Sequence, residues 1–330
     1  MKAFKLHNPT DLESALALLD TPEARSGATR VLAGGQDLLT EMKEHLAEPD
    51  ALVNLKHIPG LDQVHAGADG SLEIGALCTL AALEEHAEVA QRLPALAQAA
   101  GVVASAQIRS QATLGGNLNQ RPRCWYFRSE HAPCLKKGGT ECFSYGGMSK
   151  YNAILGGGPS YIVHPSDLAP ALVALGASAE IVSAKGSRTV ALEKYFTLPS
   201  ESDVKRETVL QPGEILRRVL VPAPAANTRS SYTKFREKGS FDFALASVAL
   251  ALVLEGGTIR SSRVVLGGVA PIPWRSKAAE AALEGGQPSR ALFEKAAAAS
   301  VRGAEALAHN GYKVPLAKGL VIRALEELCA

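Results

Sequence analysis

The stretch LAGGQDLL, residues 32–39, carries two adjacent glycines directly after a short apolar run. A second stretch, TLGGNL at residues 113–118, repeats this arrangement, and each glycine pair is followed by an amide side chain, Gln36 or Asn117. Glycine adopts positive φ and lets backbone N–H groups come close to an anion, so such loops can hold a pyrophosphate without a lysine. Taken singly, either pair is better explained as a tight turn.

Neither glycine pair has the spacing of the common nucleotide-binding motifs. The dinucleotide fingerprint needs G-x-G-x-x-G and the phosphate loop needs G-x-x-x-x-G-K-[ST]. The spacing therefore argues against a Rossmann or NTPase assignment. The sequence also lacks a metalloprotease helix motif, a nucleophile elbow and the kinase motif set, so no substrate-transforming site is expected in this chain.

Length and composition indicate a folded chain of two or three packed units. The chain has 330 residues, of which 46% are hydrophobic and 21% are charged, which is the composition of globular rather than disordered protein. A formal net charge of +2 gives no reason to expect a nucleic-acid or membrane partner. We find neither a signal-peptide core nor a membrane-spanning run, so the chain is predicted to be cytoplasmic and without a membrane span.

The pattern of apolar residues predicts an α+β chain. Thr10 is expected to cap a helix, with Glu13 three residues on, and Thr79 is expected to cap another. A small unit of strands and helix is expected over 1–55 and a larger one over 56–224. From 225 to 330, three strands precede an alanine-rich helical stretch that begins at Ser276, which is typical of a separate α+β domain.

The ordered combination of motifs along the chain is far more specific than either glycine pair. In chain order the motifs are FKLHNPTDLESAL (4–16), LAGGQDLL (32–39), ASAQIRSQATLGGNL (104–118), HPSDLAPALVALGA (164–177), GEILRRVLVP (213–222) and VVLGGVAPIPWRSKAAEAAL (264–283). Together these motifs closely resemble the FAD-binding subunit of the xanthine dehydrogenase family of molybdenum hydroxylases, over essentially the whole chain. The resemblance implies a two-part FAD-binding domain of the vanillyl-alcohol-oxidase/PCMH type, then a small C-terminal domain of the CO dehydrogenase flavoprotein type with a three-stranded sheet and helices.

The resemblance also implies which residues hold FAD. Relatives usually have Thr or Ser where this chain has Gln36, so an amide would replace a hydroxyl there. Without the resemblance, Leu216 would be interpreted as an ordinary core leucine and Lys234 as a solvated lysine. The implied set is Val31, Leu32, Ala33, Gly34, Gly35, Gln36, Asp37 and Leu38 of the first loop, Val103 and Ala104, Thr113, Leu114, Gly115, Gly116 and Asn117 of the second loop, and Asp167, Leu216 and Lys234.

An insertion at about 121–163 carries three of the five cysteines, Cys124, Cys134 and Cys142. It resembles the insertion in the flavin subunits of 4-hydroxybenzoyl-CoA reductase and of a bacterial aldehyde oxidoreductase subgroup, where four cysteines hold an extra [4Fe-4S] cluster. In those relatives the fourth cysteine stands seven residues before the aspartate of the HPSD motif. Here that position is Ser160.

Several outcomes are open for the cysteine insertion. A cluster can be kept with Ser160, His131, His164 or water at one iron, it can be a three-iron form, or it can be lost. Three thiolates and a histidine also suit zinc, although the cysteine spacings lack the usual C-x₂-C pairs. The remaining alternative is a folded loop with free thiols and no metal. Replacing a thiolate by a hydroxyl weakens binding of a soft metal centre, yet the retained cysteines favour a cluster.

By resemblance, the chain is expected to be one subunit of a heterotrimer or of a dimer of heterotrimers. A large subunit with molybdopterin would act on the substrate, a small subunit with two [2Fe-2S] clusters would pass electrons, and this FAD would exchange them with an external donor or acceptor. Two rivals remain: a stand-alone flavin oxidase, and a non-catalytic zinc-stabilised assembly subunit. The substrate, the external carrier and the direction of electron flow are not specified by the sequence.

Overall fold

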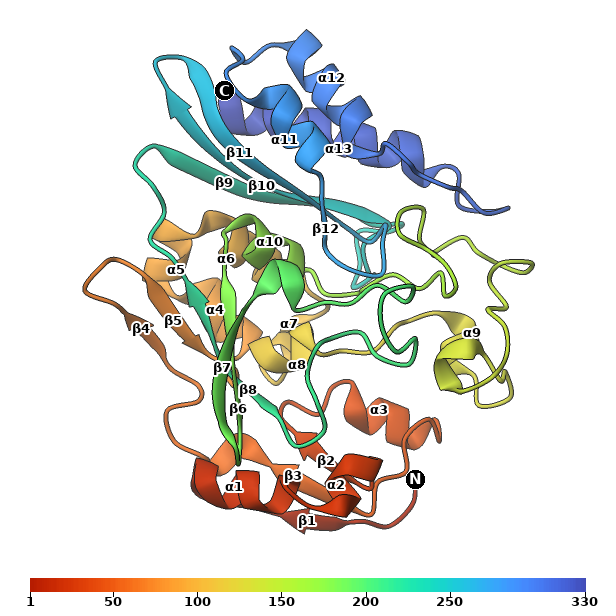
Figure 1. Ribbon diagram of the computed structural model, residues 1–330. Coiled ribbons are helices and arrows are strands. Elements are labelled where there is room, and N and C mark those ends of the chain that lie inside the picture. The colour runs from red at the N-terminus through yellow and green to blue at the C-terminus, as the bar shows by residue number, and fades with distance from the viewer.

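The computed structural model describes residues 1–330 and contains three sheets, one in each of three packed regions (Figure 1). A small N-terminal sheet lies at one end of the molecule, a five-stranded sheet lies in the middle, and a C-terminal sheet covered by helices lies at the other end. The resulting α+β architecture agrees with the fold class predicted from the sequence. No helix of the structure has both the length and the apolar character needed to cross a membrane.

The first region is a parallel three-stranded sheet in the order β1-β3-β2 with three short helices. The predicted helix cap is wrong by one residue, because Asp11 and not Thr10 has the extended backbone of a cap and accepts a hydrogen bond from the Ser14 N–H at 2.8 Å. Its elements are β1 (Lys5–His7), α1 (Leu12–Leu19), α2 (Pro22–Ser26), β2 (Thr29–Leu32), α3 (Leu38–Lys43), β3 (Ala51–Asn54) and the 3-10 turn η1 (Leu55–His57).

The second region is an antiparallel sheet in the order β4-β5-β8-β6-β7, packed against helices. The expected cap at Thr79 is confirmed, since its hydroxyl accepts a hydrogen bond from the Ala82 N–H at 3.1 Å. The strands are β4 (Val64–Ala66), β5 (Leu72–Gly75), β6 (Ser178–Ser183), β7 (Gly186–Ala191) and β8 (Ile215–Val221). The helices are α4 (Leu80–Glu85), α5 (Ala87–Arg92), α6 (Pro94–Gly101), α7 (Ala106–Arg109), α8 (Leu114–Leu118), α10 (Leu168–Ala174) and η3 (Leu192–Lys194).

The third region is an antiparallel sheet in the order β12-β11-β10-β9. Helices α11, α12 and α13 bury one face of this sheet around an apolar cluster, and α6 and α10 of the second region contact its strands as well. The two-residue strand β12 was not expected from the sequence, and it extends the predicted three strands. The elements are β9 (Thr228–Phe235), β10 (Ala246–Glu255), β11 (Thr258–Gly267), β12 (Trp274–Arg275), α11 (Lys277–Leu283), α12 (Arg290–Ser300) and α13 (Lys313–Cys329).

The cysteine insertion leaves these sheets as a long, mostly irregular excursion (Figure 1). Its only regular elements are α9 (Trp125–Arg128) and the 3-10 turn η2 (Leu135–Lys137). The buried Lys313 ties the insertion to the C-terminal region, because its ammonium group donates to the carbonyls of Tyr151 and Gly268 at 2.9 and 2.8 Å. An irregular segment of this length inside a compact fold usually has a functional reason.

Candidate functional site

The two glycine loops come from different regions of the fold and meet in space. A Cβ atom on Gly34 would collide with the backbone of Gln111 and Ala112, which directly precede the second loop. Glycine is therefore required at 34 for the first loop to pack against the segment leading into α8. The structure thus brings together two motifs that are about eighty residues apart in the chain.

The first loop offers a run of free backbone donors. The N–H groups of residues 34–38, between β2 and the first turn of α3, make no hydrogen bond to any backbone acceptor. Gly35 has φ +74°, the left-handed conformation that glycine adopts without strain. Successive N–H groups around such a residue form a concave anion-binding nest. This loop therefore has the donor set that a diphosphate requires.

The second loop is built differently, because the N–H groups of residues 114–117 already have acceptors. Leu114 and Gly115 donate to the carbonyls of Cys78 and Ala76 at 2.9 and 2.7 Å. Thr113 caps α8 by accepting the Gly116 N–H at 3.1 Å, and its carbonyl accepts from Asn117 at 2.8 Å. Gly116 is exposed between buried neighbours. The second loop thus presents a bare backbone face where a ligand can approach closely, rather than a set of free donors.

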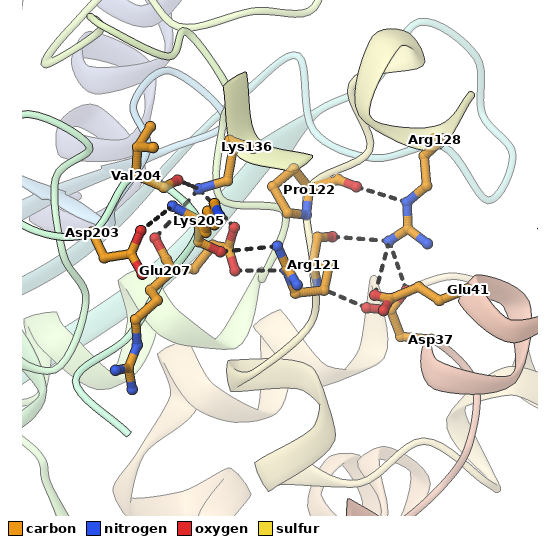
Figure 2. Close-up of polar contacts among 11 residues, drawn as sticks. Asp37, Glu41, Arg121, Pro122, Arg128, Lys136, Asp203, Val204, Lys205 and Glu207 are labelled. Carbon is orange, nitrogen blue, oxygen red and sulfur yellow. Dashed lines mark hydrogen bonds and ion pairs between the residues drawn. The ribbon is translucent and has the colours of Figure 1, made fainter. Parts of the chain in front are cut away.

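The side chain of Asp37 is turned away from its own loop and toward the cysteine insertion (Figure 2). It makes no cap to α3. One carboxylate oxygen accepts from the Arg121 N–H at 2.6 Å, and the other is 2.8 Å from both the Arg123 and Arg128 guanidinium groups. Asp37 therefore joins the first glycine loop to the insertion, while only its backbone N–H is free for a cofactor.

Asp167 and Lys234, which the sequence placed in the site separately, form a buried ion pair at 2.7 Å. The second Asp167 oxygen accepts from the Tyr232 hydroxyl at 2.6 Å, and Lys234 also donates to the Val102 carbonyl at 3.2 Å. Burial, followed by the neighbouring Asp167 carboxylate, raises the pKa of Tyr232 well above its ordinary value. The group locks strand β9 to the segment before Ala104, whose φ of +40° is unusual for a residue with a side chain.

The remaining predicted residues fall into two groups. Leu216 is buried in the main core on β8, opposite Ile181, and Val103 is also buried against that core. Asn117 is buried and accepts a hydrogen bond from the Ser166 hydroxyl at 2.6 Å, which connects the second loop to the HPSD motif. Along the first loop Gln36 is exposed, whereas Val31, Leu32, Ala33 and Leu38 are partly buried.

The three cysteines of the insertion line one cavity, and Ser160 lines it with them. Its wall is mainly apolar, with Phe127 among its lining side chains. No three Cys, His, Asp or Glu side chains lie close enough together to hold a single metal ion. The insertion therefore gathers its cysteines around one cavity rather than into a site for a single metal ion.

The polar surroundings of the thiols differ from one another. Burial raises the pKa of the Cys124 thiol, while the backbone N–H groups of Phe127 and Tyr126 and the Asn152 amide act in the opposite direction. The Asn152 amide nitrogen lies 3.8 Å from the Cys124 sulfur. The Cys142 sulfur lies 3.0 Å from the hydroxyl of Ser144, which is fully buried.

Neither histidine named as an alternative ligand lines the cavity. The His131 side chain is 88% exposed on the surface. His164 is buried, and burial lowers its pKa to about 3, so it stays neutral. Its ring packs edge-on against Phe196 with centroids 4.7 Å apart.

A buried charge network that the sequence did not reveal runs beside the cavity (Figure 2). Lys136, two residues after Cys134 and 3% exposed, is 2.8 Å from the Glu207 carboxylate and donates to the Val204 carbonyl at 2.6 Å. Glu207 is also 2.7 Å from Arg121, whose N–H reaches Asp37. The network therefore extends from the cavity wall to the first glycine loop. The sequence showed the basic residues of the insertion, but it gave no indication of which acidic residues pair with them.

Comparisons with known proteins agree with this geometry. Residues 2–224 match the family of FAD binding domains in molybdopterin dehydrogenase, and residues 230–328 match the CO dehydrogenase flavoprotein C-terminal domain. The chain is 36% identical to the aldehyde oxidoreductase FAD-binding subunit PaoB of Escherichia coli K12, covering 99% of this chain and 98% of that protein. It is 29% identical to the carbon monoxide dehydrogenase medium chain of Hydrogenophaga pseudoflava, over 98% and 96% of the two chains.

Solved structures show the same relationship. A carbon monoxide dehydrogenase from Hydrogenophaga pseudoflava that lacks the Mo-pyranopterin moiety matches with a TM-score of 0.77 and 27% identity, over 98% of this chain and 96% of that one. The likeness thus spans both family domains at nearly full length. The chain therefore belongs to the FAD-binding medium subunits of the molybdenum hydroxylase family.

Proposed function

We propose that this chain is the electron-transfer subunit of a molybdenum-containing hydroxylase, dehydrogenase or reductase complex. It would hold FAD between its two glycine loops and exchange electrons between the [2Fe-2S] clusters of a small partner subunit and an external donor or acceptor. A large molybdopterin subunit would act on the substrate. The observation that carries this proposal is the run of free N–H groups at 34–38, packed against the second loop.

The chain's own residues would position the flavin rather than react with substrate. The first loop would donate its N–H groups to the diphosphate, and the bare face of Gly116 would let the cofactor pass close to α8. The Asp167–Lys234 pair would fix the strand and the loop around Ala104 where a flavin contact is expected. Bound FAD would supply the redox chemistry, since flavins exchange electrons with both one- and two-electron partners. The cofactor residues span the units 1–55, 56–224 and 225–330 that we propose for the chain.

We further propose that the cysteine cavity holds an iron–sulfur cluster. A single zinc ion needs its sulfur ligands about 2.3 Å from the metal, so the thiols would have to meet at one point. A multi-iron cluster takes thiolates at separate corners, and its irons prefer thiolate ligands. Three thiols that line one largely apolar cavity suit the second arrangement. When bound, such a cluster would provide a one-electron relay.

The test is an anaerobic purification of the chain with its partner subunits, followed by FAD and metal analysis. We expect one FAD per chain, iron in the chain, and reduction of FAD by substrate only while the small subunit is present. FAD should stay bound after the small subunit is removed. The likeness to PaoB makes aldehydes the first substrates to try. Turnover of substrate by the isolated flavin chain would instead support a stand-alone oxidase, and a colourless zinc protein would support the assembly subunit.

A further inference from the structure

The cavity has a fourth corner that is not a thiol. Ser160 lines the same cavity as the three cysteines and is only 2% exposed. Its segment is held firmly, because the Tyr161 carbonyl accepts from the Ala153 N–H at 2.9 Å and from the Asn152 amide at 3.0 Å. That same amide lies 3.8 Å from the Cys124 sulfur. The Asn152 side chain therefore links the backbone directly after Ser160 to Cys124.

The other candidates for the fourth corner fail on position. His131 is exposed and His164 does not line the cavity. Ser144 does line it, but lies 3.0 Å from the sulfur of Cys142, two residues away. Ser144 is therefore placed to hydrogen-bond a thiolate that already occupies a corner. Tyr126 also lines the cavity, but its hydroxyl oxygen is taken up by a hydrogen bond from the Met148 N–H at 2.8 Å. Ser160 is the remaining oxygen-bearing side chain of the wall.

We propose that Ser160 is the fourth ligand of the cluster site, so that one iron is held by an oxygen and three by sulfur. This inference rests on the cluster proposed above. A serine hydroxyl must lose its proton to become an anionic ligand, and oxygen is a harder donor than iron–sulfur clusters prefer. The proton leaves to solvent as the Fe–O bond forms. The iron at this corner is consequently held more weakly than the three at thiolate corners.

The test compares Ser160→Cys, Ser160→Ala and wild type as full-length, FAD-loaded chains purified anaerobically. Each is treated with ferricyanide, a one-electron oxidant, and each Fe²⁺ released accompanies one electron accepted by ferricyanide. Iron release is measured with a chelator, and the cluster is observed by low-temperature EPR. We expect wild type to lose one iron per chain. The rate of iron release should be at least about tenfold lower in S160C and higher in S160A, in line with the effects of altering a metal site's surroundings.

Ser149→Cys is the matched control, because it makes the same exchange at a fully buried hydroxyl of the insertion that does not line the cavity. S149C should release iron at the wild-type rate. Equal rates for wild type and S160A, or equal protection by S149C and S160C, would overturn the assignment of Ser160. FAD without iron in every variant would refute the cluster and this inference together while leaving the flavin assignment intact. Loss of FAD from wild type would refute the proposed function itself.

Discussion

Gly116→Ala separates a cofactor role of the second glycine loop from a folding role. Gly116 is exposed on α8, and a Cβ atom there would meet only the Thr113 hydroxyl, at 3.0 Å. Alanine in place of a helical glycine stabilises by about 0.5–1 kcal/mol. Crowding the Thr113 cap would cost up to about 1 kcal/mol. The two effects nearly cancel, so the free energy of unfolding of the chain without FAD should stay within about 1 kcal/mol of wild type.

The effect on FAD should be larger than the effect on folding. If the cofactor passes over the bare face of Gly116, an added methyl group would push it away from the free N–H groups of the first loop. We expect FAD affinity to fall by about tenfold or more, equivalent to about 1.4 kcal/mol. The assay is fluorescence titration of the FAD-free chain with FAD, together with thermal unfolding of the same preparations.

Gly319→Ala is the matched control for this experiment. Gly319 also lies within a helix, α13, and a Cβ atom there would have no neighbour within 4 Å. G319A should gain the same helical stabilisation and bind FAD as wild type does. Unchanged FAD affinity in G116A would refute our placement of the second loop against the cofactor. If G116A unfolds and G319A does not, Gly116 is needed for packing of the chain.

Further variants test the charged groups that hold the site and the insertion in place. Asp37→Asn should destabilise the chain by about 1–3 kcal/mol because it leaves partly buried guanidinium groups without their carboxylate, whereas Asp50→Asn, which breaks an exposed pair, should leave the urea midpoint nearly unchanged; urea unfolding measures both. Lys234→Met should destabilise more than the double variant Lys234→Met/Asp167→Asn, because the single change leaves a buried carboxylate unpaired. Burial lowers the pKa of Lys313 from 10.5 to about 7, so the unfolded chain binds more protons between these values and stability should rise with pH from 7 to 10.5. Lys313→Met should flatten that rise, and an unchanged slope would show that Lys313 titrates normally.

Local patterns predicted much of the fold. Strands β9, β10 and β11 and the helices after Ser276 were predicted from apolar runs and alanine content, and the Thr79 cap from a single residue. The error at Thr10 is instructive, because adjacent Thr10 and Asp11 are both good caps and only the backbone conformation decides between them. The strand β12 was missed because two residues carry no periodicity, and it forms only by pairing with β11.

The sequence indicated the site through glycines and spacing but not through its charges. Counting seven residues back from Asp167 identified Ser160, and the cavity contains that residue. The role of Asp37 could not be predicted in the same way. Its partners Arg121 and Arg128 lie 84 and 91 residues away, and nothing local pairs them with this aspartate. The family pattern assigns Asp37 to the cofactor loop, whereas its carboxylate contacts the insertion.

This contact has a consequence for how the two redox sites depend on each other. The insertion is anchored at three places: to the first glycine loop through Asp37, to the second region through Glu207, and to the C-terminal region through Lys313. Lys136 and Arg121 share the Glu207 carboxylate, so the wall of the cysteine cavity and the segment that contacts the flavin loop are parts of one buried network. Buried networks respond as units, since removing one charge leaves its partners unpaired. Disorder around Cys124, Cys134 and Cys142 should therefore weaken FAD binding although none of these cysteines belongs to a glycine loop, and loss of FAD should loosen the cavity in return.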